Sequence, residues 1–149
     1  MNEAVSYALL VVLGVAIISS TFAVFNNLQT SLVSVAIKSE ANRVLEYVSR
    51  NVLLAYRTVL EGANITITLE LPSNIQGYRY YIKFNVSING EKQIVLLIPT
   101  KNLSIIKQLS TIDESIVFQG QIDSRQLKEM IPVIRASPNL IVLEVVPSG

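Results

Sequence analysis

The sequence contains no cysteine, histidine or tryptophan, and only 15% of its 149 residues are charged. Without cysteine the chain cannot form disulfides, a thiolate nucleophile, or thiolate zinc and iron–sulfur sites. Without histidine it lacks the commonest metal ligand and the commonest general base. A net charge of +1 disfavours nucleic-acid binding, which calls for a basic patch. We therefore expect a protein that is not an enzyme, uses no cofactor or metal, and has no nucleic-acid partner.

Motifs for other chemistry are also missing. A catalytic triad of the usual kind cannot be built without histidine, and the six glycines are dispersed rather than gathered in a phosphate-binding loop. The acidic residues Asp113, Glu114 and Asp123 lack the spacing of a calcium-binding loop, and we expect them to be solvated carboxylates. The tyrosine-rich run 78–81 could stack on a glycan or a base, but alternation along a strand favours burial of Tyr78 and Tyr80 in the core.

Charge is very unevenly distributed along the chain. Residues 1–37 contain one charged residue, Glu3, and the other 22 lie between Lys38 and Gly149. Residues 4–25 (AVSYALLVVLGVAIISSTFAVF) include no charge, Asn, Gln or Pro. A helix of about 20 apolar residues spans a bilayer core, so this segment is long enough to cross a membrane. It is longer than the apolar part of a secretory signal peptide, and no basic residue precedes it.

The helical pattern continues beyond the apolar segment. Residues 26–60 contain neither proline nor glycine, and Gly62 is the first residue suited to a helix C-cap. The sequence thus predicts a helix over about residues 3–60, roughly 85 Å long at about 1.5 Å per residue. In 41–60 the spacing of three and four predicts one buried stripe: Ala41, Val44, Leu45, Val48, Val52, Ala55, Tyr56 and Val59.

After Ala63 the hydrophobic period changes from helical to two, which predicts strands over 64–71 and 78–88. Asn89–Gly90 then predicts a hairpin with a type I′ turn, followed by a return strand over 91–98 that ends at Pro99. The run 94–98 is apolar on both faces, as in a central strand or one beneath a helix. The pattern of 102–110 fits either a strand or a short helix. Further strands are expected at 115–122, 131–135 and 140–146, with a helical turn over 124–130 capped by Ser124.

These elements predict an α+β protein, with a long N-terminal helix followed by a small antiparallel β-sandwich-like domain. We expect the division at the change of period, with the helix over 1–62 and an exposed β domain over 63–149. Three N-x-S/T sequons begin at Asn64, Asn85 and Asn102, all in the β domain. Alternation places Asn64 and Asn85 on outward faces, so the three asparagines are candidate N-glycosylation sites in an exported domain.

An uncharged helix from the first residues (MNEAVSYALLVVLGVAIISSTFAVF), an amphipathic continuation and a small β domain together resemble archaeal type IV pilins and archaellin-like filament subunits. In that family a peptidase removes a short basic leader, so this chain, with no Lys or Arg before Glu3, is expected to be the mature form beginning at Met1. The resemblance implies a homo-oligomeric helical filament on the cell surface, assembled from a membrane-inserted precursor and serving in adhesion. Bacterial members carry a glutamate near the N-terminus that can meet a neighbour's amine. Glu3 is its counterpart, or simply a carboxylate favoured by the helix dipole.

The resemblance also implies which residues pack in a filament core. Small residues in the apolar segment, such as Gly14, Ala16 and Ala23, would let helix backbones approach closely. Four apolar residues off the buried stripe, Tyr47, Leu53, Leu54 and Leu60, are either surface residues or contacts with neighbouring copies. The expected assembly residues of the apolar segment are Glu3, Val5, Leu9, Leu10, Val12, Leu13, Val15, Ile17, Ile18, Phe22 and Phe25.

Two other hypotheses remain open at this stage. The chain could be a single-pass membrane-anchored protein whose exported β domain binds a cell-envelope partner, like a subunit of the external anchor of the archaellum motor. It could also be an enzyme tethered by one helix, which its composition disfavours. The amphipathic extension to Leu60 favours the filament subunit, because a simple anchor has little use for so long a helix.

Overall fold

The computed structural model describes residues 2–148. The long helix α1 spans Asn2–Leu60, and the chain divides into two compact units, residues 1–37 and 38–149, which we describe separately. The division at 37/38 differs from the expected one at 62/63, since the second part of α1 belongs to the same unit as the strands. Met1, expected to be the mature N-terminus, lies outside the described residues.

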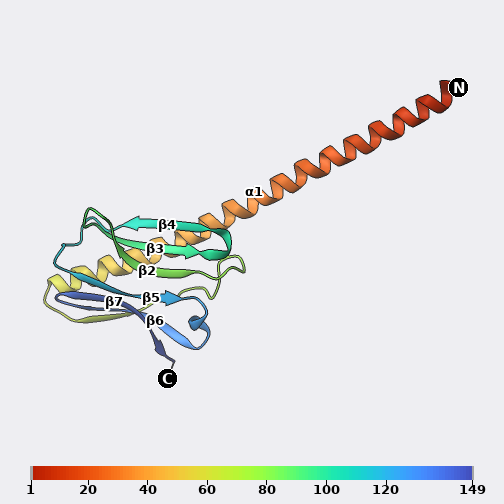
Figure 1. Cartoon of the computed structure of the whole chain (residues 1–149). Coiled ribbons are helices and arrows are strands. Elements are labelled where there is room, and N and C mark those ends of the chain that lie inside the picture. Colours follow the sequence, from red (N-terminus) through yellow and green to blue (C-terminus); the bar gives the residue numbers. More distant parts are fainter. Residues whose placement is uncertain (1, 149) are drawn as a thin grey trace. The chain divides into compact units, whose positions relative to one another are not determined.

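The second unit contains one mixed sheet (Figure 1). Its seven strands have the order β1-β6-β7-β5-β2-β3-β4, and neighbours pair antiparallel except β5 and β7, which are parallel. The α+β class with a long N-terminal helix is thus confirmed. The strands are β1 (Ile65–Thr68), β2 (Tyr81–Val86), β3 (Lys92–Ile98), β4 (Leu103–Gln108), β5 (Val117–Asp123), β6 (Met130–Ser137) and β7 (Leu140–Pro147).

Strand β5 joins the two halves of this sheet by changing partners. Residues 117–120 pair with β7, and residues 121–123 pair with β2. Gly120 lies at the change and has a φ of +99°, in the region that favours glycine. A Cβ at this position would lie 1.9 Å from the carbonyl oxygen of Leu143. Only glycine therefore allows β5 to pass this close to β7 and then turn toward β2.

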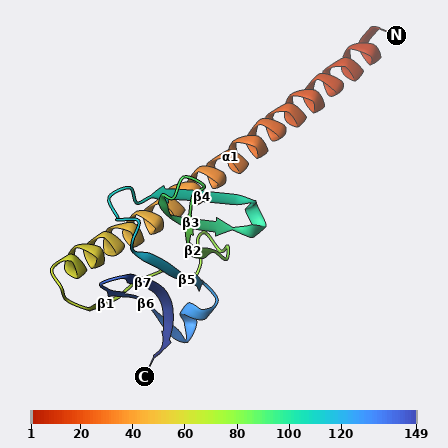
Figure 2. The same cartoon turned by 60° about the vertical axis from the view of Figure 1, so that its left-hand side comes forward.

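The second part of α1, residues 38–60, lies along one face of the sheet (Figures 1 and 2). The predicted stripe is confirmed, because all eight of its residues are buried and Ala41, Val48, Val52 and Ala55 are fully so. Residues that face them across the core come from both halves of the sheet. The fully buried strand residues are Ile82, Ile94, Leu96, Ile98, Ile122, Ile134, Ile141 and Leu143.

Several local predictions are confirmed and three are wrong. Strand β3 is buried on both faces between β2 and β4, as its apolar run indicated, and 103–108 forms a strand rather than a helix. The hairpin after β2 forms, but only Gly90 of the Asn89–Gly90 pair has a positive φ. Its amide donates to the Ser87 carbonyl and the Ser87 amide donates to the Glu91 carbonyl, so the loop has three residues, with a type I turn that ends in a left-handed glycine, rather than type I′.

Ser124 does not cap the helical turn that follows it. Its hydroxyl accepts a hydrogen bond from the Tyr80 amide, and the short 3₁₀ helix η2 spans Gln126–Lys128 with Arg125 before it. The expected inward set of 78–88 also fails at its end. Val86 and Ile88 are exposed at 49% and 106%, because the hairpin extends past the core at that point. Periodicity identified the strand but not where its neighbours end.

Candidate assembly surface

The apolar segment 4–25 offers a large exposed hydrophobic surface on the first part of α1. The segment is long and apolar enough to cross a membrane, judged by length and composition, and within the described residues it is not buried. Its large side chains are exposed all round the helix, with Leu13 at 57% and Ile18 at 70%. Exposure of so large an apolar surface to water is unfavourable, so this surface must lie against lipid or against other apolar side chains. All eleven expected assembly residues, Glu3 included, are exposed on this helix.

Hydroxyl groups in this part of α1 hydrogen-bond to the helix itself. The Ser20 hydroxyl donates to the Ala16 carbonyl oxygen at 2.7 Å, and the Thr21 hydroxyl donates to Ile17 at 2.8 Å. These bonds satisfy the hydroxyls without water, which is what an apolar surrounding requires. The segment can therefore enter lipid, or a bundle of like helices, without leaving these two polar groups unpaired.

Glu3 lies in the first turn of α1. The partial positive charge of a helix N-terminus stabilises a carboxylate there. Glu3 is the one charged side chain of residues 2–37, and a carboxylate is costly in an apolar environment unless a counter-charge pairs with it.

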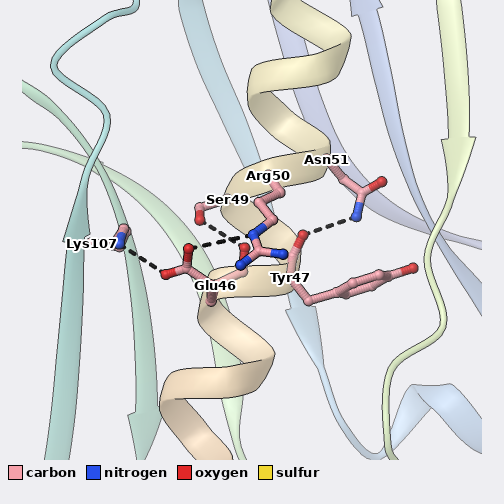
Figure 3. A network of polar contacts seen from close by, with 6 residues as sticks. All are labelled: Glu46, Tyr47, Ser49, Arg50, Asn51 and Lys107. Atoms are coloured by element: carbon pink, nitrogen blue, oxygen red, sulfur yellow. Dashed lines mark hydrogen bonds and ion pairs between the residues drawn. The ribbon is translucent and has the colours of Figure 1, made fainter.

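The second unit has a polar network between α1 and strand β4 (Figure 3). The Lys107 ammonium donates to Glu46 Oε2 at 2.9 Å, and Arg50 Nε lies 3.5 Å from Glu46 Oε1. The hydrogen bond and charge of Lys107, with a smaller effect of Arg50, hold the pKa of Glu46 below its usual range. Tyr47 lies on the same turn, and its hydroxyl accepts from the Glu70 amide. These contacts link the helix to edge strand β4 and to the segment that follows β1, the strand at the opposite edge of the sheet.

The remaining candidate residues lie in the core or on the surface of the second unit. Tyr80 is fully buried, and burial raises its pKa, so the core interpretation of that tyrosine is correct. The pKa of Asp113 is lowered by the Ser115 amide, and that of Asp123 by Arg125. Among residues 2–148 no three His, Cys, Asp or Glu side chains are grouped to hold a metal.

The three sequon asparagines are all exposed, and the outward placement of Asn64 and Asn85 is confirmed. Asn64 and Thr66 line a shallow depression of about 340 Å³ beside β6 and β7, which also includes Arg135. Asn85 lies within β2 opposite Gln93. Asn102 follows the 3₁₀ helix η1 (Pro99–Lys101) with a left-handed backbone, φ +47°. Each side chain is thus accessible from solvent.

Two features of the second unit were not evident from the sequence. The Lys107–Glu46 pair joins residues 61 positions apart, and only the register of β4 beside α1 brings them together. The exposure of Ile88 depends on where the hairpin ends, and the strand pattern had placed this residue inward.

The chain matches one family over nearly its whole length. The family described as "Family of unknown function (DUF7266)" matches residues 1–145, which include the apolar segment and all seven strands except the last residues of β7. No curated protein and no solved structure matches the chain.

Proposed function

The chain belongs to the DUF7266 family, and we propose that it is the structural subunit of an extracellular cell-surface filament. In this proposal the subunit is inserted in the membrane by residues 4–25 before assembly. It then polymerises with identical copies, like an archaeal type IV pilin, through its apolar helix. The β domain forms the outer layer, where it serves in surface adhesion. The proposal assigns no enzymatic activity, cofactor or nucleic-acid partner to the chain.

One observation carries the proposal, namely the exposed apolar surface of residues 4–25 on a helix that continues to Leu60. Burying a large apolar side chain stabilises by roughly 1.5–3 kcal/mol, so ten such residues per subunit would supply tens of kcal/mol before entropic costs. A bundle of identical helices can bury this surface without lipid. A contact between two different faces of the same subunit generates a helical filament when its rotation does not close into a ring.

The expected core residues suit such a bundle. They comprise Glu3 at the helix start, with Val5, Leu9, Leu10, Val12, Leu13, Val15, Ile17, Ile18, Phe22 and Phe25 along it, and all are exposed in the single chain. In this proposal Asn64, Asn85 and Asn102 face solvent on the outside of the filament, where N-linked glycans can be attached. Their exposure supports this part of the proposal.

The second candidate function is a single-pass membrane-anchored protein whose exported domain binds a cell-envelope partner. The same observation favours it, because residues 4–25 make a helix of about 33 Å, close to the thickness of a bilayer core. The two candidates differ in where the apolar surface ends up. In the first it is covered by other subunits, and in the second it stays in lipid.

Shearing separates these candidates. Cells expressing the full chain are sheared mechanically without detergent, and the chain is followed by immunoblot in the sheared supernatant and in the membrane fraction. We expect most of the mature chain in the sheared material, in particles that sediment at high speed. A Leu13→Arg variant, with a charge in the middle of the apolar segment, should be absent from that material. Recovery of the wild-type chain in the membrane fraction alone would overturn the filament proposal in favour of the anchor.

A further inference from the structure

The solvent side of α1 in the second unit has a row of arginines at a spacing of seven. Arg43, Arg50 and Arg57 are all exposed, and a spacing of seven places them along one line of the helix. Arg50 is near Glu46 at 3.5 Å. Among residues 2–148, neither Arg43 nor Arg57 lies within ion-pair distance of a carboxylate. This face therefore has a positive charge that its own chain neutralises only in part.

Two leucines lie between the last two arginines. Arg50, Leu53, Leu54 and Arg57 occupy positions i, i+3, i+4 and i+7, and we call this set the leucine patch. Four residues at that spacing form the hole that receives one side chain from a partner in helix packing. Leu54 is 54% exposed and Leu53 is half-buried. The patch thus has two apolar side chains at its centre and a guanidinium group at each end.

The opposite combination occurs at one end of the sheet. We call the turn 87–91 together with Asp113 and Glu114 the hairpin tip, and Figure 1 shows the two loops at the same end of the sheet. A Cβ on Gly90 would lie 3.8 Å from Glu114 Oε1, so the loops are in contact. Ile88 at the apex is fully exposed, at 106%. Turns are rich in polar residues and glycine, so a fully exposed isoleucine at the apex of a turn is unusual.

The charge of the hairpin tip is negative. Glu91, Asp113 and Glu114 are exposed, whereas the nearby Lys92 is 8% exposed with its ammonium donating to the Glu114 carbonyl oxygen. The tip therefore presents an isoleucine surrounded by carboxylates, and the leucine patch presents leucines flanked by guanidinium groups. The charges of the two surfaces are opposite, each surface has exposed apolar side chains, and both surfaces belong to one chain.

We propose that the hairpin tip of one copy docks on the leucine patch of a second copy, with Ile88 inserted over Leu53 and Leu54. Glu91 and Glu114 then meet Arg50 and Arg57. Because the contact joins two different surfaces, a copy that uses one of them can still offer the other to a further copy, and the contact can repeat along a polymer. This inference rests on the proposed filament, to which it adds an outer contact beyond the apolar helices.

Such a contact is small, well below the area of a stable interface between free proteins. We therefore expect it to form only where copies are already held together, because a high effective concentration compensates for weak affinity. The test must use the full chain in cells rather than dilute protein. Since the sequence contains no cysteine, introduced cysteines report on single positions without a background.

The experiment co-expresses two full-length variants, Ile88→Cys and Leu54→Cys, the second with a C-terminal epitope tag that separates mixed dimers from like dimers on a gel. Disulfides are formed with a mild oxidant in sheared material and in the membrane fraction. The control replaces Ile88→Cys by Val117→Cys, a residue 48% exposed on β5. We expect mixed dimers about tenfold more abundant with Ile88→Cys than with Val117→Cys, and fewer at high salt.

Charge reversal tests the specificity of the contact. Arg50→Glu with Arg57→Glu on the Leu54→Cys chain should reduce mixed dimers about tenfold, and Glu91→Lys with Glu114→Lys on the Ile88→Cys chain should restore them. The matched control is Arg79→Glu with Lys83→Glu on the Leu54→Cys chain. It makes the same change of charge on exposed residues outside the leucine patch, and should leave the yield of mixed dimers unchanged.

The proposal is overturned if Ile88→Cys and Val117→Cys give equal yields, or if the charge swap fails to restore the dimers. Filaments without the cross-link would overturn this contact and leave the filament proposal standing. A specific cross-link in the membrane fraction, without filaments, would support the contact and overturn the filament. Absence of both would overturn both proposals.

Discussion

At the scale of single residues, Gly120 illustrates how one position determines the arrangement of the sheet. The residue combines a φ of +99° with a backbone carbonyl 1.9 Å from where a Cβ would be. Strand β5 needs this position to leave β7 and pair with β2. Gly77 has a similar φ of +80°, but no atom lies within 4 Å of its would-be Cβ. A side chain at Gly77 would therefore meet only the unfavourable φ, whereas one at Gly120 would also clash with the backbone. Comparing the two positions distinguishes backbone strain from steric clash.

We predict that Gly120→Ala lowers the free energy of unfolding by at least about 3 kcal/mol, because the Leu143 backbone must move and β5 loses its pairing. Gly77→Ala should cost only about 1 kcal/mol, from the strained φ alone. Both are measured by urea unfolding of the full chain in micelles, followed by tyrosine fluorescence. Equal losses in the two variants would mean that the Gly120 contact is not as close as described.

The Glu46 carboxylate gives a pH-dependent contribution to stability. Its pKa in the folded chain lies below the usual value of 4.5, chiefly because of Lys107. A lowered folded-state pKa means that the stabilisation is complete above about pH 4.5 and is lost as the pH falls through the lower folded-state value. Glu46 is 43% exposed, so the effect is small.

We therefore predict that Glu46→Gln is less stable than the wild-type chain at pH 7 and that this difference disappears toward about pH 3. Thermal unfolding across this pH range measures it. Glu70→Gln, which removes an exposed carboxylate outside the ion pairs of the described residues, serves as the control and should show no such convergence. A difference that persists unchanged at pH 3 would exclude the ion pair as its source.

At the scale of elements, α1 has two parts with different relations to water. In residues 38–60 one stripe is buried against the sheet, and the other sides are polar apart from a few exposed apolar residues. Leu45 on the stripe is 2% exposed, whereas Leu60 at the end of the helix is 66% exposed. The same residue type thus occurs in both environments on one helix.

We predict that Leu45→Ala lowers the free energy of unfolding by about 2–5 kcal/mol, the range for removing a buried leucine side chain. Leu60→Ala should change it by less than about 0.5 kcal/mol, as is usual for exposed positions. Urea unfolding of the two variants under the same conditions is the measurement. If both variants lose the same stability, the helix does not pack on the sheet through the predicted stripe.

Elements with a regular hydrophobic period could be predicted from the sequence, and those that depend on partners could not. The helical stripe from Ala41 to Val59 was predicted because a helix repeats every 3.6 residues whatever it packs on. The parallel pairing of β5 with β7 depends on Gly120 and on the path of the chain between strands, which periodicity does not encode. Likewise Asn89–Gly90 identified the hairpin, but the register of β2 and β3 determined the type of turn.

The same distinction applies to the candidate assembly surface. Features of a single segment could be predicted from the sequence, and contacts between distant segments could not. The apolar segment 4–25 was evident from its lack of charge, since that property needs no partner in the fold. The pair of Glu46 and Lys107, and the exposed Ile88 between two acidic loops, arise only when distant parts of the chain meet. Their residue types alone carry no signal of that proximity.

At the scale of the whole molecule, the chain consists of an apolar helical unit and a unit with its own core. The buried hydrophobic residues come from α1 after residue 36, from the strands and from the loops between them, so the core includes none of residues 4–25. In our proposal the first unit supplies membrane insertion and polymerisation, and the second supplies the outer surface.

We predict that deletion of residues 4–25 yields a soluble protein with an intact sheet that no longer polymerises. Circular dichroism and cooperative thermal unfolding measure folding, and analytical ultracentrifugation measures the absence of polymers. Leu45→Ala in the same background should lower its melting temperature, which confirms that the native core has formed. Filaments formed by the deleted chain would make the helix-core account untenable.

The most direct test of the central claim is electron microscopy of material sheared without detergent from cells expressing the full chain. Our account predicts filaments whose helical reconstruction fits this sequence, with residues 4–25 of many copies bundled at the centre and the β domains outside. Glycan density at Asn64, Asn85 or Asn102 would appear on the outer surface. Absence of filaments, with the chain confined to the membrane fraction, would contradict the account and identify the protein as an anchored β domain.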